Sequence, residues 1–108
     1  MTSILLRDFQ GLVIRLTTER RNHILDHPEM SAMETAIEET LLNPERLVQS
    51  LSDTEVRLYY RFYFRTVVGG KFLCVVVKFA QESPFLLTAY LTDRIKKGVT
   101  LWPKRSDT

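Results

Sequence analysis

Residues 56–92 read VRLYYRFYFRTVVGGKFLCVVVKFAQESPFLLTAYLT, and this stretch decides the fold. It holds three runs rich in aromatic and β-branched residues, separated by two turn signals, and therefore predicts three successive β-strands. Alternation along the first strand places on one face Val56, Leu58, Tyr60, Phe62 and Phe64. The other face receives the residues called the Arg/Tyr row below, which are Arg57, Tyr59, Arg61, Tyr63 and Arg65. We expect the first face to be buried and the Arg/Tyr row to be exposed.

Two further strands complete the stretch. Val68-Gly69-Gly70 indicates a hairpin turn, because glycine accepts positive φ. Residues 72–79 are almost wholly apolar, so we expect the second strand to be covered on both faces. A turn over residues 81–84 leads to a third strand at residues 86–92. In this strand we expect Leu87, Ala89 and Leu91 to be buried, which leaves Thr88 and Tyr90 on the exposed face with the Arg/Tyr row.

The residues before this stretch predict a hairpin and a first helix. Strand-like runs at residues 4–6 and 12–16 flank a turn that contains Asp8, Gln10 and Gly11. Thr17 or Thr18 can then cap a helix that runs to about residue 26. His27-Pro28 ends this helix, because a residue before proline avoids the helical region.

A second helix is expected to begin at Ser31. Ser31 and Glu34 have the spacing of a capping box, and Asn43-Pro44 stops the helix. Its apolar stripe comprises Met33, Ala36, Ile37, Thr40 and Leu41.

The order of these elements predicts an α+β fold, with an N-terminal hairpin, two α-helices and then a curved antiparallel meander whose one face carries the helices. Residues 47–51 are expected to form a short strand, residues 93–98 a loop or helical turn, and residues 101–103 an apolar patch. A chain of 108 residues fits a single domain. We place this domain at residues 1–103 and expect a frayed tail at residues 104–108.

The composition favours a soluble cytoplasmic protein. Cys74 is the only cysteine, so an intrachain disulfide is excluded, and its apolar neighbours predict a buried, inert thiol. The start MTSILLRDFQG lacks the long apolar run of a signal peptide. No apolar run approaches the ~20 residues that a membrane span needs.

Charge is divided unevenly along the chain. Residues 1–54 hold five arginines, no lysine and nine acidic residues, a net charge of −4. Residues 55–108 hold ten lysines and arginines against four acidic residues, a net charge of +6. This division favours an anionic partner for the C-terminal half, although a solvated sheet face explains it equally well.

Metal chemistry has little support in the sequence. His23 and His27 stand four residues apart on the first helix, a spacing that can direct both side chains toward a metal ion. No H-E-x-x-H pattern accompanies them, and the spacing marks no third ligand. We therefore expect neither a metal nor another cofactor.

Metal-independent cleavage of RNA matches the residues better. This reaction needs a base for the 2′-hydroxyl, cations for the phosphorane and an acid for the leaving oxygen. The candidates are His23 or His27 for proton transfer, Arg61 with Lys78 for the phosphate, and Tyr90 with Thr88 for orientation. The residues expected to hold RNA by charge and by stacking on unpaired bases are Arg57, Tyr59, Tyr63 and Arg65, and His27 is a further candidate for substrate binding.

Five segments carry a resemblance to a known family. They read TERRNHILDHPEM (18–30), NPERLVQS (43–50), LYYR (58–61), GKFLCVVVK (70–78) and LTAYLT (87–92). Together, over about residues 12–102, they resemble the phage-type, toxin-like branch of the barnase–EndoU–colicin–RelE nuclease superfamily. The resemblance implies two helices followed by a curved antiparallel sheet, and metal-free RNA cleavage by residues on the exposed sheet face and a helix.

The resemblance also implies a set of site residues and partners. The motif positions are His23, His27, Glu29, Arg61, Lys78, Thr88 and Tyr90. RNA is the implied partner, with an antitoxin or immunity protein and a second copy as further candidates, and no membrane. The alternatives are a non-catalytic RNA- or protein-binding module that uses the Arg/Tyr row, and an interaction module whose open face a partner covers. His27 can also be purely structural, as a residue that closes the first helix.

Overall fold

The N-terminal hairpin has the predicted position. In the computed structural model, which describes residues 2–80 and 83–103, β1 (Ser3–Arg7) pairs with β2 (Val13–Thr17) in antiparallel register. Gly11 in the connecting turn has a φ of 86°, which only glycine adopts readily. The Asp8 carboxylate accepts bonds from the backbone N–H groups of Gln10 and Leu12, both at 2.9 Å. The hairpin prediction is confirmed.

The first helix is also confirmed, whereas the start of the second is corrected. Thr17 caps α1 (Thr18–Leu25) by accepting a bond from the Arg20 N–H at 3.2 Å. A short 3-10 helix, η1 (Pro28–Met30), follows, and the Ser31 hydroxyl bonds back to its Pro28 carbonyl at 3.1 Å. The capping box is therefore wrong, because its serine is already engaged and α2 (Glu34–Leu42) begins three residues later without a side-chain cap.

The second half of the chain is an antiparallel meander, as predicted. It comprises β3 (Arg46–Ser50), β4 (Val56–Tyr63), β5 (Lys71–Phe79) and β6 (Pro84–Thr92). Residues 81–82 of the predicted turn and the tail at 104–108 lie outside the described residues.

A seventh strand replaces the predicted apolar patch. After the loop at residues 93–97, β7 (Gly98–Trp102) pairs with β3 in antiparallel orientation. Gly98 is required at this contact, because a Cβ atom would collide with the carbonyl oxygen of Gln49. The sequence signal was missed because five residues with two polar or glycine positions do not form a clear alternating run.

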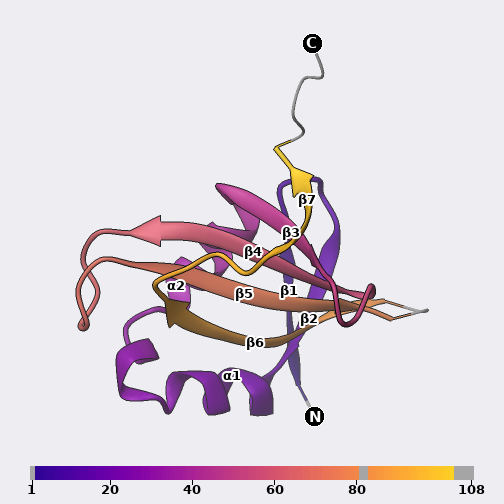
Figure 1. The fold of residues 1–108 in the computed structure, drawn as a ribbon. Helices are drawn as coiled ribbons and strands as arrows, with labels where there is room; N and C mark the ends of the chain where they lie inside the picture. The colour runs from indigo at the N-terminus through magenta and orange to yellow at the C-terminus, as the bar shows by residue number, and fades with distance from the viewer. Residues whose placement is uncertain (1, 81–82, 104–108) are drawn as a thin grey trace.

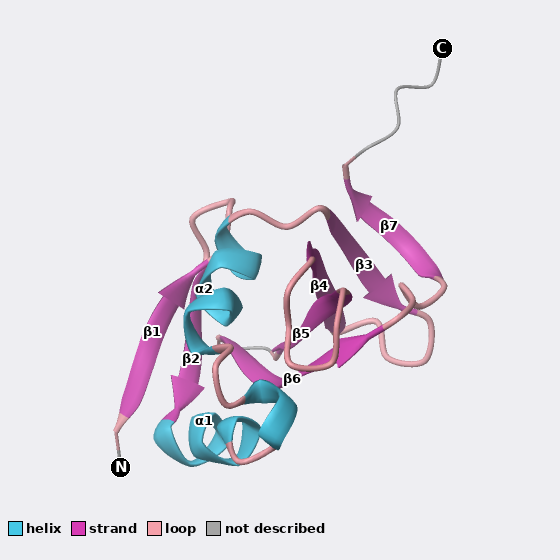
Figure 2. Ribbon diagram, turned by 90° about the vertical axis from the view of Figure 1, so that its left-hand side faces the viewer, coloured by secondary structure: helices cyan, strands magenta, loops and turns pink. Residues whose placement is uncertain are grey.

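The seven strands form one mixed sheet in the order β1-β2-β6-β5-β4-β3-β7 (Figure 1). Every neighbouring pair is antiparallel except β2 and β6, which are parallel and meet at the single residue pair Arg15 and Phe85. Figure 2 shows the hairpin at one margin of the molecule and β7 at the other, with the two helices beside the hairpin. The coarse α+β architecture is therefore the predicted one.

The helices cover the face of the sheet that was expected to be open. The main core joins the hairpin, the helices and this face, and it includes Ile24, Leu41, Tyr59 and Val75. Tyr59 is fully buried there, and Tyr63 packs against the same core. The predicted exposure of the Arg/Tyr row is thus wrong, because tyrosine rings are apolar enough for a helix interface when their hydroxyl groups find partners. The predicted burial of Leu58 and Tyr60 on the other face is confirmed.

The opposite sheet face is called the open face below, because no helix of the described residues packs on it. A second, smaller core cluster lies on it and includes Val48, Leu58, Tyr60 and Cys74. The loop at 93–97 covers part of this face, because Ile95 packs on the cluster and the Lys96 N–H donates to the Tyr60 hydroxyl at 3.0 Å. Cys74 is fully buried, as predicted, and burial raises the pKa of its thiol to about 11.

One buried hydrogen bond joins the hairpin to the meander. The Tyr59 hydroxyl donates to the Asp8 carboxylate at 2.7 Å, and both residues are almost completely excluded from water. Asp8 thus uses one oxygen for the turn and the other for the sheet.

Replacing Tyr59 with phenylalanine tests this bond. We expect Tyr59→Phe to lower the free energy of unfolding by about 1.5–3 kcal/mol, the usual contribution of a hydrogen bond to a charged group. Urea denaturation measures the loss. Tyr63→Phe is the matched control, since its hydroxyl bonds Glu39 at an exposed position, and its loss should be smaller. Equal losses in the two variants would contradict a special role for Asp8.

Candidate functional site

The tyrosines of the Arg/Tyr row are engaged within the protein, Tyr59 completely buried and Tyr63 half-buried. Tyr59 is buried against Asp8, and the Tyr63 hydroxyl lies 2.6 Å from a carboxylate oxygen of Glu39 and 3.2 Å from the carbonyl oxygen of Ala36, both on α2. Burial raises the pKa of Tyr63 to about 12. These two side chains attach the sheet to the helices and the hairpin. The expected role of Tyr59 in stacking on bases is therefore wrong, whereas that of the half-buried Tyr63 stays a prediction.

The arginines of the row are also engaged within the protein. The Arg57 guanidinium lies 4.2 Å from the centre of the Phe79 ring. Arg61 donates to the carbonyl oxygen of Asn43 at 2.8 Å and lies 3.9 Å from Glu39. Arg65 alone is exposed, just beyond the end of β4.

Lys78 lies on the other face of the sheet from Arg61. Its ammonium group contacts Asp53 at 3.0 Å and Glu55 at 3.8 Å. The hydrogen bond with Asp53 raises the pKa of Lys78 and lowers that of Asp53, so this ion pair is present at neutral pH. The structure therefore does not bring Arg61 and Lys78 to one phosphate.

Thr88 and Tyr90 were expected to share a face with the Arg/Tyr row. They lie instead on the open face, which is opposite to that row. Thr88 pairs with Val76 and is exposed, whereas Tyr90 pairs with Cys74 and is half-buried. Burial raises the pKa of Tyr90, so it remains a neutral phenol that can donate a hydrogen bond.

His23, one of the predicted catalytic residues, lines a hollow. This space of about 310 Å³ lies between α1 and β6, and we call it the α1–β6 hollow; its residues are Glu19, Arg20, His23 and Leu87. Glu19 and His23 stand one helical turn apart on α1, so both side chains lie on one helix face. A carboxylate, a guanidinium and an imidazole therefore surround one space that is open to solvent.

A β-bulge shapes the floor of the hollow. The register of β5 and β6 shifts between Val76 and Val77, so that Leu87 is the extra residue between Leu86 and Thr88. Leu86 is buried in the main core, whereas Leu87 packs on the open-face cluster. Bulges of this kind redirect side chains and are common beside functional sites. Leu87 was expected to share a face with Ala89 and Leu91, and the bulge is the reason that it does not.

Arg20 is held in place beside this floor. It donates to the carbonyl oxygen of Leu87 at 3.1 Å, and its guanidinium lies 5.6 Å from the centre of the Phe85 ring. Arg15 lies over the same ring at 5.9 Å and donates to the Ser83 hydroxyl at 2.9 Å. Because a guanidinium carries five N–H donors, both arginines retain donors for an anionic ligand.

His27 lies next to His23 but outside the hollow. The two rings meet edge to face, with their centres 5.8 Å apart. His27 precedes η1 as its N-cap without a side-chain capping bond. Across residues 2–80 and 83–103, no group of three or more His, Cys, Asp or Glu side chains is placed to hold a metal ion.

The open face carries an aromatic ladder that the sequence was expected to bury. Tyr60, Phe72, Phe62 and Phe64 follow one another edge to face, at centre distances of 6.3, 5.1 and 5.0 Å. Phe64 is 83% exposed at the end of this ladder, where the β4–β5 loop projects from the sheet (Figure 1). The rings shield one another instead of packing under a helix.

Cations lie beside the ladder. The loop at 93–97 starts from β6 where Thr92 pairs with Phe72, and it crosses the open face to Tyr60. Its Arg94, Lys96 and Lys97 are exposed, and none of them has an ion-pair partner within the described part of the chain.

Sequence reasoning missed Glu19, Arg20 and the aromatic ladder. The helical spacing of Glu19 and His23 was a usable signal, since positions four apart on a helix are neighbours. The position of Leu87 in the floor of the hollow had no such signal in the sequence, because a bulge depends on how two strands pair.

The comparisons add no relative to this picture. Neither the family models, nor the curated proteins, nor the solved structures include a match to the chain. In the described part of the chain, neither helix has the length and apolar character needed to cross a membrane.

Stability should fall in alkali because of the tyrosines. Burial raises the pKa of Tyr60 from 10.0 to about 12 and also raises those of Tyr59, Tyr63 and Tyr90. The folded state holds these protons more tightly, so this stability is complete below about pH 10 and is lost as the pH rises further. Urea denaturation at a series of pH values measures the decline. Tyr60→Phe should make the decline shallower; an unchanged slope would contradict the assignment.

Proposed function

We propose that this chain is a metal-independent, toxin-like endoribonuclease whose reaction takes place in the α1–β6 hollow. The observation that carries the proposal is the meeting of Glu19, Arg20 and His23 around one solvent-open space. These are the three kinds of group that the reaction requires, namely a base, a phosphate-binding cation and an acid. The order of hairpin, two helices and meander supports the proposal, because the resemblance to the barnase–EndoU–colicin–RelE superfamily implies helices before an antiparallel sheet.

The proposed reaction assigns one role to each side chain. Glu19 takes the proton of a ribose 2′-hydroxyl, whose oxygen attacks the adjacent phosphorus. Arg20 holds the phosphate oxygens with the donors that Leu87 leaves free. The bond from phosphorus to the 5′-oxygen breaks, and protonated His23 gives its proton to that oxygen. The products are a 2′,3′-cyclic phosphate and a free 5′-hydroxyl.

We place the binding site for single-stranded RNA on the open face. Exposed aromatic rings beside unpaired cations are typical of surfaces that bind single-stranded nucleic acid. Here the aromatic ladder ends at Phe64, and Arg94, Lys96 and Lys97 line the loop next to it. This placement replaces the Arg/Tyr row, whose tyrosines lie under the helices.

Cleavage of a labelled single-stranded RNA in EDTA tests the catalytic assignment. We expect products that end in 2′,3′-cyclic phosphate, and rates at least about 100-fold lower for His23→Ala and Glu19→Gln. Asn22→Ala, at an exposed position of the same helix, is the matched control and should keep the wild-type rate. A folded protein without cleavage would overturn the proposal. Loss of activity in Arg61→Ala but not in Arg20→Ala would instead assign phosphate binding to Arg61, beside the end of α2.

Binding of a fluorescent single-stranded RNA to the inactive His23→Ala variant tests the open face. Adding Phe64→Ala should weaken binding by about 1–3 kcal/mol, the usual value of one stacked base. Leu51→Ala is the control, because Leu51 is 70% exposed but lies in the β3–β4 turn, away from the ladder. Fluorescence anisotropy measures both. Equal affinities in the two variants would remove the aromatic ladder from the proposed site.

A further inference from the structure

The two outer strands of the sheet differ in how they are protected. β7 follows Lys96-Lys97 and precedes Pro103, residue types that discourage further strand pairing. β1 reads SILLR and pairs regularly with β2 along all five residues, without a bulge, lysine or proline. Its other edge faces no strand within the described residues. Leu5 is 68% exposed on this strand, which makes β1 a ready template for an added strand.

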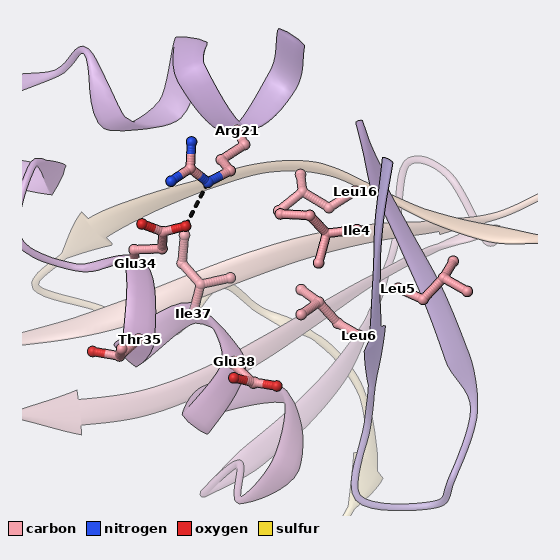
Figure 3. A pocket seen from close by; sticks show the side chains of 9 residues that line it. All are labelled: Ile4, Leu5, Leu6, Leu16, Arg21, Glu34, Thr35, Ile37 and Glu38. Atoms are coloured by element: carbon pink, nitrogen blue, oxygen red, sulfur yellow. Dashed lines mark hydrogen bonds and ion pairs between the residues drawn. The ribbon is translucent and has the colours of Figure 1, made fainter. Parts of the chain in front are cut away.

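A hollow lies directly beside this edge. It has a volume of about 260 Å³ and opens between β1 and α2. Figure 3 shows the side chains of its apolar floor facing one another, Ile4, Leu6 and Leu16 from the hairpin and Ile37 from α2. Its apolar surroundings suit one bulky aliphatic side chain.

The rim of the hollow is acidic. Arg21 on α1 forms an ion pair with Glu34 on α2, so these two charges neutralise each other (Figure 3). Glu38, one turn further along α2, also lines the hollow and has no ion-pair partner in the described part of the chain. An occupant with an apolar side chain next to a cation would therefore match both the floor and the rim.

We propose that β1 is the docking edge for an extended segment of a partner protein. The segment adds to the sheet as an eighth strand, inserts an aliphatic side chain into the hollow and places a lysine or arginine against Glu38. Main-chain bonds to the edge then provide affinity, and the hollow selects the sequence, as in other cases of strand addition. This inference is independent of RNA cleavage, because it uses neither the α1–β6 hollow nor the open face.

A second copy of the chain fits this edge less well. Antiparallel pairing of two β1 strands about Leu5 would set Ser3 opposite Arg7. Ile4 and Leu6 face α2, so alternation directs Arg7 to the other side of the sheet. Glu38 would then gain no cation, whereas a lysine or arginine beside the inserted side chain supplies one.

The test uses a fluorescein-labelled peptide, Ser-Thr-Leu-Thr-Lys-Thr-Val-Thr-Ser, whose leucine and lysine share one face of a strand. We expect it to bind the full chain, and we expect Glu38→Gln to weaken binding about threefold, as for an exposed ion pair. Thr35→Trp should abolish binding by filling the hollow from an exposed position. Leu42→Ala, at the far end of α2, is the control and should bind normally.

Two further measurements separate strand addition from other modes. A peptide with N-methyl groups on alternate amides should lose binding, since it cannot pair with an edge. Bound peptide should slow hydrogen exchange in β1 and leave exchange in β7 unchanged. Absence of binding by the unmodified peptide, or equal binding by the methylated one, overturns the proposal. Self-association of the free chain with protection of β1 assigns the edge to a second copy and also overturns it.

Discussion

The hydrogen bond between Tyr59 and Asp8 sets the arrangement of the whole molecule. The Asp8 carboxylate is buried, so each of its oxygens must find donors inside the protein, and it finds them in its own turn and in the middle of β4. This contact joins the hairpin to the face of β4 that carries the Arg/Tyr row, which is also the face that the helices cover. In the described part of the chain every buried side-chain nitrogen and oxygen has a partner, so the interface accepts these polar residues without an unsatisfied group.

The sequence predicted the elements better than it predicted their orientation. Turn signals, the cap at Thr17 and the apolar run of β5 are local, and each was found where expected. Alternation along β4 separates two faces, but Tyr59 and Tyr60 occupy different faces and both are fully buried. Which face the helices cover depends on contacts with distant residues, among them the main core and the bond to Asp8. No local pattern contains that information, and the bulge at Leu87 was hidden for the same reason.

The position of the helices over the Arg/Tyr row also explains where the proposed sites lie. With the helices over the Arg/Tyr row, Phe62, Phe64 and Phe72 are left on the open face and contact one another. Two adjacent arginines of α1 serve different regions, since Arg20 bonds the floor of the α1–β6 hollow and Arg21 pairs with Glu34 at the rim of the other hollow. The single helix α1 therefore borders both the proposed reaction site and the proposed docking edge.

The parallel contact between β2 and β6 has a consequence for how the chain assembles on the ribosome. Arg15 and Phe85 pair although they are 70 positions apart in the sequence, so β2 has no neighbour on that side until β6 has been synthesised. β3 likewise has no neighbour on its outer side until β7 has been synthesised, and β7 comes after the other six strands in the sequence. Local contacts can form the hairpin and α1 early, but both flanks of the sheet are completed only by segments that emerge late. Until then the nascent chain exposes two additional strand edges.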